Sequence, residues 1–300
     1  MRARSRVTRV RGGSSRERGG AGLPTLGAVR AMTWNVWWRF GGAWREREAA
    51  VLGVLADVRP DVLALVETWR DGDVTQADVV AAHLGLPSAV FVPTGLPPVP
   101  EDDDDPDLSG VEMGVALVSR WPPLATRTVP LPAAQRPGPP AHALVATLDH
   151  PAGPLHVLVA TLEWEPRYDE DRMAQAWALA DLAADADLDG DLPVLVLGDL
   201  NATPTGPQLA ALTRQLTDLW PAGGGDPAAV TLSSRVPEAP LEVTELIDQR
   251  IDHVLARPGR PGLPGAAVRA SGARLAGDRP VAGRYPSDHF AVVVDVELTS

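Results

Sequence analysis

The sequence predicts a domain of the α/β or α+β class, and three observations support this prediction. Segments with helical periodicity alternate with short apolar segments from Ala28 to the end of the chain. The short apolar runs have the length and composition of strands that are buried on both faces of a sheet. The apolar fraction of 45% is ordinary for a chain with a hydrophobic core. Because we find no internal repeat and no linker, we expect one domain over residues 28–300.

Two segments have the spacing of amphipathic helices. The first covers residues 44–58 and ends before Pro60, since helices usually stop ahead of a proline. The second covers residues 168–184, where apolar residues recur at intervals of three and four. Strands are predicted for the apolar runs at residues 29–36, 62–66, 115–119, 143–148, 155–162, 194–197, 251–255 and 290–296.

The first 27 residues differ in composition from the rest of the chain. They are rich in Arg and Gly and lack apolar periodicity, so we expect a disordered tail over residues 1–27. The tail is either a basic arm that contacts nucleic acid or anionic lipid, or a dispensable extension, with Met32 as an alternative start. Its scattered apolar residues do not form the stretch of a secretory signal, and we expect a cytoplasmic protein.

Charge and composition exclude several classes of site. The chain has no Cys, so disulfides and thiolate metal sites are excluded. No apolar run is long enough for a membrane-spanning helix. The net charge is −12 although the first 30 residues are basic, and an acidic body weighs against tight, non-specific binding of nucleic acid. The acidic run at residues 101–107 lacks the Gly and final Glu of an EF-hand loop, so we expect a solvated loop there.

Oxygen-bearing side chains follow or flank several predicted strands. Taken singly, each has an ordinary structural explanation, such as capping of a turn. Side chains at strand ends nevertheless converge in such sheets, and four carboxylates in one cleft would repel one another unless a cation were present. With oxygen ligands and no Cys, we expect Mg²⁺ or Mn²⁺. The four carboxylates are Glu67, Asp199, Asp252 and Asp288.

The order and wording of these segments resemble the endonuclease/exonuclease/phosphatase superfamily, from about residue 30 to the C-terminus. The resemblance implies a four-layer sandwich of two packed mixed β-sheets with helices outside. It also implies a hydrolase of phosphoesters, acting on nucleic acid or on a small molecule or lipid headgroup, and we expect a monomer. The matching segments are Thr-Trp-Asn-Val at 33–36, Glu67, residues 114–120, Gly-Asp-Leu-Asn at 198–201, Arg-Ile-Asp at 250–252 and Ser-Asp-His at 287–289.

The resemblance also implies a metal site. Glu67 would be the main carboxylate ligand of the ion, and Asn35 and Asp288 would help to hold the ion or its waters. A dication offsets the negative charge that develops on a phosphoester as it is attacked.

Catalytic roles are carried over from the resemblance in the same way. Asp199 would orient and deprotonate the attacking water, and Asn201 would position that water or the phosphate. His289 would donate to the phosphoryl oxygens, with Asp252 holding its tautomer.

One position departs from the resemblance. The family usually has a His after the strand predicted at residues 155–162, whereas this chain has Glu163. His156 cannot replace it, because seven residues of strand span roughly 23 Å. A carboxylate that faces a phosphate is unfavourable unless it is protonated or bound to metal. Glu163 therefore either binds a second ion or weakens hydrolysis, and the second case would leave a catalytically impaired binding module.

Overall fold

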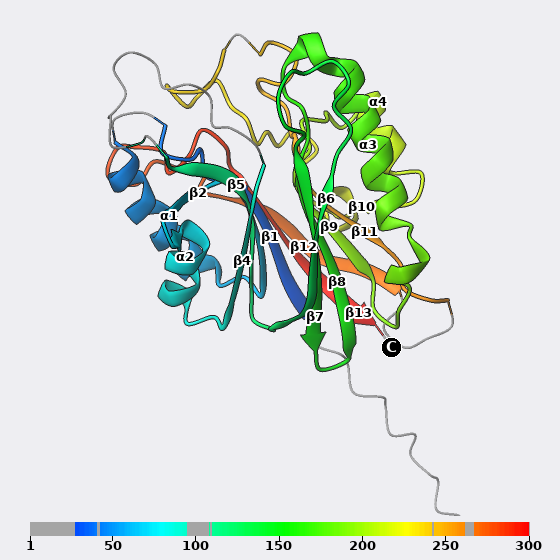
Figure 1. Cartoon of the computed structure of the whole chain (residues 1–300). Coiled ribbons are helices and arrows are strands. Elements are labelled where there is room, and N and C mark those ends of the chain that lie inside the picture. The colour runs from blue at the N-terminus through cyan, green and yellow to red at the C-terminus, as the bar shows by residue number, and fades with distance from the viewer. Residues whose placement is uncertain are drawn as a thin grey trace, which may run out of the picture.

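The computed structural model describes residues 28–40, 43–94, 108, 110–241, 243–261 and 267–299. The expected tail at residues 1–27 and the acidic run at residues 101–107 lie outside this part of the chain. The described residues form two β-sheets that pack face to face, with helices on both outer faces (Figure 1). The four-layer sandwich is therefore confirmed.

The first sheet has seven strands in the order β12-β13-β1-β2-β5-β4, with β3 attached to β2. It is mixed, because β1 runs parallel to β2 but antiparallel to β13. Its strands are β1 (Ala28–Asn35), β2 (Val62–Asp71), β3 (Val74–Thr75), β4 (Ser88–Pro93), β5 (Glu112–Ser119), β12 (Ala267–Ala276) and β13 (Ala291–Thr299).

The second sheet has six strands in the order β10-β11-β9-β8-β7-β6. It is also mixed, since β8 and β9 are parallel while β9 and β11 are antiparallel. Its strands are β6 (Pro123–Pro130), β7 (His142–His150), β8 (Gly153–Thr161), β9 (Val194–Asp199), β10 (Thr217–Asp218) and β11 (Asp252–Arg257).

The helices cover the outer faces of the two sheets. Helices α1 (Trp44–Val58) and α2 (Gln76–Leu84) pack on the first sheet. Helices α3 (Asp169–Ala183) and α4 (Pro207–Leu212) pack on the second, and the short helix α5 (Leu219–Ala222) follows β10 (Figure 1). The expected helix at residues 44–58 is confirmed, and the expected helix at 168–184 is confirmed one residue shorter at each end.

Alternation along the strands separates three hydrophobic clusters. On β9, Leu195 and Leu197 face the layer between the sheets, whereas Val194 and Val196 face α3. On β1, Ala31 faces the same inner layer, whereas Met32 and Trp34 pack under α1. These buried, alternating strands carry the side chains at their ends into one place.

Candidate functional site

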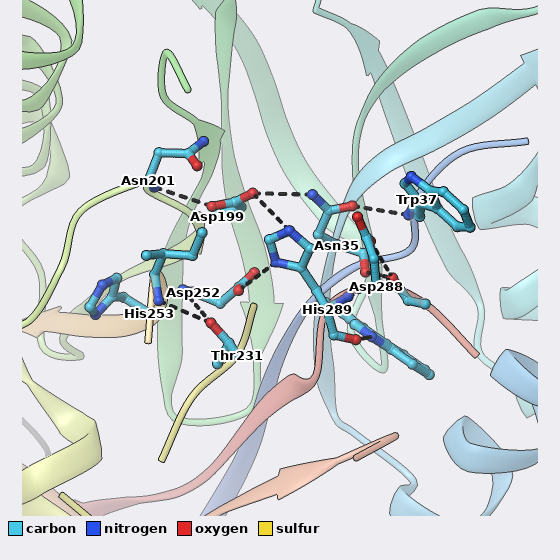
Figure 2. A network of polar contacts seen from close by, with 12 residues as sticks. Asn35, Trp37, Asp199, Asn201, Thr231, Asp252, His253, Asp288 and His289 are labelled. Atoms are coloured by element: carbon cyan, nitrogen blue, oxygen red, sulfur yellow. Dashed lines mark hydrogen bonds and ion pairs between the residues drawn. The ribbon is translucent and has the colours of Figure 1, made fainter. Parts of the chain in front are cut away.

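The candidate site lies where the layer between the two sheets reaches one end of the sandwich. Asn35 is the last residue of β1 and Asp199 the last of β9, and both continue the alternation that points inward. Asp252 begins β11 and pairs directly with Asp199 across the antiparallel ladder. The segment just before β13 brings Asp288 and His289 to this same end of the sandwich (Figure 2).

Glu67 reaches the site through an irregularity in β2. Val66 packs in the layer between the sheets, so strict alternation would turn Glu67 toward α1 and α2. The pairing of β2 with β5 shifts register between Leu65 and Thr68, and Glu67 takes a left-handed φ of 50°. Its Oε1 then accepts a hydrogen bond of 3.0 Å from Asn35 Nδ2. A left-handed non-Gly residue is strained, and such strain concentrates at functional sites.

The His289 ring lies between two carboxylates, as Figure 2 shows. Its Nδ1 is 2.9 Å from Asp252 Oδ2, and its Nε2 is 3.9 Å from Asp199 Oδ2. Its main-chain carbonyl accepts a hydrogen bond from Trp34 Nε1 at 2.9 Å. The Asp252 contact orients the ring so that Nε2 faces Asp199.

Asp199 is held by two further hydrogen bonds. Asn35 Nδ2 donates to its Oδ2 at 3.1 Å, and the backbone N–H of Asn201 donates to its Oδ1 at 3.1 Å. Asn201 has a left-handed φ of 44°, and its Nδ2 donates to the carbonyl of Leu162 at 2.9 Å. These bonds tie the Gly-Asp-Leu-Asn segment to the end of β8.

Three acidic side chains of the site have raised pKa values. Burial and the nearby Asp288 raise the pKa of Glu67 to about 7. Burial and the nearby Asp252 raise the pKa of Asp199 to about 7. Burial also raises the pKa of Asp288. These shifts mean that several carboxylates share one buried place without enough positive charge beside them.

The pKa of His289 is also raised, but by charge rather than by burial. Burial opposes a charged imidazole, but the carboxylates of Asp252, Asp199 and Asp288 outweigh burial and raise the pKa of His289 well above its usual value. The ring is therefore protonated near neutral pH and can donate from Nε2 while Nδ1 stays bonded to Asp252.

Two neighbouring sets of side chains could hold a cation. Asp199, Asp252 and His289 offer ligand atoms that lie within 4.8 Å of one another, but His289 Nδ1 is already engaged by Asp252. Asn35 and Glu67 are linked by a hydrogen bond of 3.0 Å, and burial and the charge of Asp288 raise the pKa of Glu67. An oxygen-rich set that lacks a compensating charge fits a hard dication such as Mg²⁺ or Mn²⁺.

Comparison with known families identifies the fold and its chemistry. A model of the Endonuclease/Exonuclease/phosphatase family matches residues 32–289. The chain belongs to this family. Members of this superfamily are hydrolases that act on phosphoester bonds. A comparison with curated proteins finds no match, and no helix in the described part of the chain is long and apolar enough to cross a bilayer.

Solved structures of family members agree with the fold. An endonuclease/exonuclease/phosphatase from Beutenbergia cavernae superimposes with a TM-score of 0.67 at 25% identity, covering 91% of this chain and 72% of that chain. TDP2 from D. rerio, complexed with a single strand DNA product, gives 0.67 at 18% identity, covering 90% and 99%. The human Nocturnin catalytic domain with bound sulfate anion gives 0.65 at 18% identity, covering 91% and 95%.

Glu163, the position that departs from the expected pattern, makes contacts that argue against binding of a second metal ion. Arg136 Nη1 donates to both carboxylate oxygens of Glu163, at 2.6 and 2.7 Å. The backbone N–H groups of Trp164 and Glu165 also donate to its Oε1. A carboxylate with these partners has little capacity left for a cation. Arg136 balances the charge of Glu163. The unbalanced carboxylate that was the reason to expect a catalytically impaired binding module is therefore absent at this position.

Two residues that support the site were missed by sequence reasoning. Thr231 is buried, its Oγ1 accepts hydrogen bonds from the backbone of Ile251 and Asp252, and its carbonyl accepts one from Phe290. It therefore links the strand that carries Asp252 to the strand that follows His289. A Thr in a long loop carries no sequence signal of this role, because the contacts join segments distant along the chain.

Arg47 of α1 is the second residue that sequence reasoning missed. Its guanidinium lies 4.3 Å from the centre of the Trp37 ring and donates to the carbonyl of Phe40. Burial lowers its pKa to about 10, opposed by the charges of Asp288 and other acidic groups including Glu67. Arg47 thus fastens the segment after β1 and partly offsets the acidic charge of the site.

Proposed function

We propose that this chain hydrolyses phosphoester bonds with the help of a bound divalent cation, Mg²⁺ or Mn²⁺. The observation that supports this proposal is the gathering of buried acidic groups around the His289 ring at the end of the sandwich, where burial raises the pKa values of Glu67 and Asp199. A cation would restore the carboxylates to their charged form, and an anionic phosphoester needs both a cation and a hydrogen-bond donor.

Glu67, Asp288 and Asn35 are the residues that would hold the cation. When bound, the cation supplies charge that offsets the developing negative charge of the phosphoryl group. Asn35 Nδ2 already bonds both Glu67 and Asp199, so it also keeps the metal-binding and proton-accepting carboxylates at a set spacing.

The remaining residues handle protons. Asp199 accepts a proton from the attacking water, and its own orientation is maintained by Asn35 and by the backbone of Asn201. His289 donates from Nε2 to a phosphoryl oxygen, because Asp252 occupies Nδ1 and keeps the ring charged. These residues are close enough to act on one phosphorus centre.

The cation requirement is tested with Glu67→Gln. We expect hydrolysis of bis-p-nitrophenyl phosphate by the intact chain to stop on chelation and return with Mg²⁺. The Gln variant should need at least about tenfold more Mg²⁺ for half-maximal activity, since losing a carboxylate ligand weakens metal binding. Mg²⁺ should also raise the melting temperature of the wild type more than that of the variant.

Glu112→Gln is the matched control for this experiment. Glu112 lies on the neighbouring β5, opposite Arg70 of β2, and is outside the site. Its replacement removes the same charge, so the Mg²⁺ requirement should stay at the wild-type value. An equal Mg²⁺ requirement in wild type and Glu67→Gln would contradict the assigned metal site. Undiminished turnover after chelation would contradict the cation itself.

Asp252→Asn tests the protonation of His289. The amide keeps the shape of the side chain but no longer favours a charged ring, so we expect kcat to fall by about 10²-fold or more. Because both residues act as a unit, adding Asp252→Asn to a His289→Ala background should cost little more. Losses that simply multiply in the double variant would show that Asp252 does not act through His289.

A further inference from the structure

We propose that Arg136 binds a phosphate oxygen of the substrate at the mouth of the site. This inference rests on the proposed function, because it assigns a substrate contact for the same reaction. Arg136 belongs to the segment between β6 and β7, and its side chain pairs with Glu163. Four features of the structure carry the proposal.

The first feature is the position of Glu163 beside Asp199. Strand β8 runs parallel to β9, with Thr161 level with Asp199. The ladder continues one step further, since the backbone N–H of Leu162 donates to the carbonyl of Asp199 at 3.1 Å. Asn201 closes the same junction through its bond to the carbonyl of Leu162. Glu163 is therefore the next residue after a segment that is bonded to both Asp199 and Asn201.

The second feature is the burial of Glu163. Strand β8 ends at Thr161, and the backbone N–H of Glu163 donates to Gln175 Oε1 of α3 at 2.7 Å. The Glu163 side chain is 3% exposed, so its carboxylate needs a cationic partner.

The third feature is the way in which Arg136 meets Glu163. Its side chain is 39% exposed, and only Nη1 makes the contacts with Glu163. Nη2 and Nε make no hydrogen bond to another residue in the described part of the chain. One end of the guanidinium is thus anchored by a buried carboxylate, and the other end presents donors to solvent. Two donors in a fixed fork suit a phosphate group.

The fourth feature is that the segment carrying Arg136 is fastened without its side chain. Asp171 of α3 accepts hydrogen bonds from the backbone N–H groups of Ala134, Gln135 and Arg136. Gln175, one turn later, donates to the carbonyl of Pro132 and accepts from the backbone of Glu163. The backbone contacts hold the loop without the Arg136 side chain, and the bond to Glu163 orders that side chain before substrate arrives.

The charges also favour this assignment. An unpaired Glu163 at this place would repel an anionic substrate, and Arg136 cancels that charge. A guanidinium bonded to a carboxylate on one edge can still donate to a phosphate on another edge. The pair thus places an N–H donor where a carboxylate alone would have faced the phosphate.

The test measures competitive inhibition by inorganic phosphate, with Mg²⁺ present, in the variant Arg136→Gln. We expect the inhibition constant and KM for bis-p-nitrophenyl phosphate to rise about tenfold, with kcat within about twofold, because a charged hydrogen bond is lost. Arg127→Gln is the control: Arg127 lies on β6 and pairs with Asp185 on the surface, so neither constant should change.

Arg136→Lys separates phosphate binding from a purely structural role. Lys keeps the positive charge for Glu163 but lacks the second set of guanidinium donors. Its inhibition constant should therefore rise as well, while its melting temperature stays near that of the wild type. Unchanged inhibition constants in both variants would overturn the proposal. So would a lowered melting temperature with a lower kcat and an unchanged KM, which describes a loop anchor.

Calorimetry distinguishes failure of this inference from failure of the proposed function. Titration of inorganic phosphate into the intact chain with Mg²⁺ needs no turnover. If the wild type hydrolyses no phosphoester, the proposed function fails, but weaker phosphate binding by Arg136→Gln still supports the Arg136 contact. Equal binding by wild type and variant, or no binding by the wild type, overturns it even where hydrolysis is observed.

Discussion

Replacing Asp199 with Asn is expected to lower kcat for phosphodiester hydrolysis by about 10³-fold, because an amide cannot accept the proton of the attacking water. The substitution preserves the shape of the side chain and the bond from the backbone of Asn201 to Oδ1. KM should change little, since Asp199 is not a substrate anchor in the proposed mechanism. Steady-state kinetics with saturating Mg²⁺ measure both constants.

Stability provides an independent check on the same variant. The pKa of Asp199 is raised by burial and by Asp252, so the charged form of Asp199 lowers the stability of the folded protein. Asp199→Asn removes that charge but also replaces Oδ2, which accepts from Asn35 Nδ2, by an N–H donor, so it should melt close to the wild-type temperature. Asp185→Asn, which alters a surface ion pair with Arg127, serves as the control for activity. Activity of Asp199→Asn within tenfold of wild type would refute the assignment of the general base.

Gly198→Ala is expected to lower the free energy of unfolding by about 3 kcal/mol or more, the upper range for overpacked cores. Gly198 lies opposite Ala160 in the parallel pairing of β8 with β9. A Cβ built on Gly198 would lie 1.8 Å from the carbonyl oxygen of Ala160, and that atom belongs to the backbone of a central strand. The two strands must separate to admit the methyl group, and urea denaturation measures the cost.

Gly53→Ala is the matched control for this substitution. Gly53 is in the middle of α1, and a Cβ there would meet no atom within 4 Å. Removing a Gly from a helix interior should raise stability by about 0.5–1 kcal/mol. A similar small change in both variants would show that the close approach of β8 and β9 is not rigid. A larger loss at Gly198 would explain why a Gly precedes Asp199.

Local sequence signals predicted the buried elements but not the peripheral ones. The helix α1 and the inner strands β1, β2, β8 and β9 were identifiable because their apolar residues follow a clear period or form a continuous run. The edge strand β6 was missed because its residues are mostly exposed and it begins and ends with Pro. The edge strand β12 consists mostly of small residues with two Arg, and its pairing with β13 creates a strand that composition does not indicate.

The sequence by itself determined which residue types end the buried strands, and hence the acidic, oxygen-rich chemistry around Asn35, Asp199 and Asp252. Alternation along a strand is a local rule, so it can be applied before the fold is known. Only the tertiary structure decided the parts that break this rule or join distant segments. Glu67 enters the site because β2 shifts register against β5. The charge of Glu163 is balanced by Arg136, which lies 27 residues away in the sequence. Contacts of this kind depend on which strands become neighbours, and no local pattern encodes that.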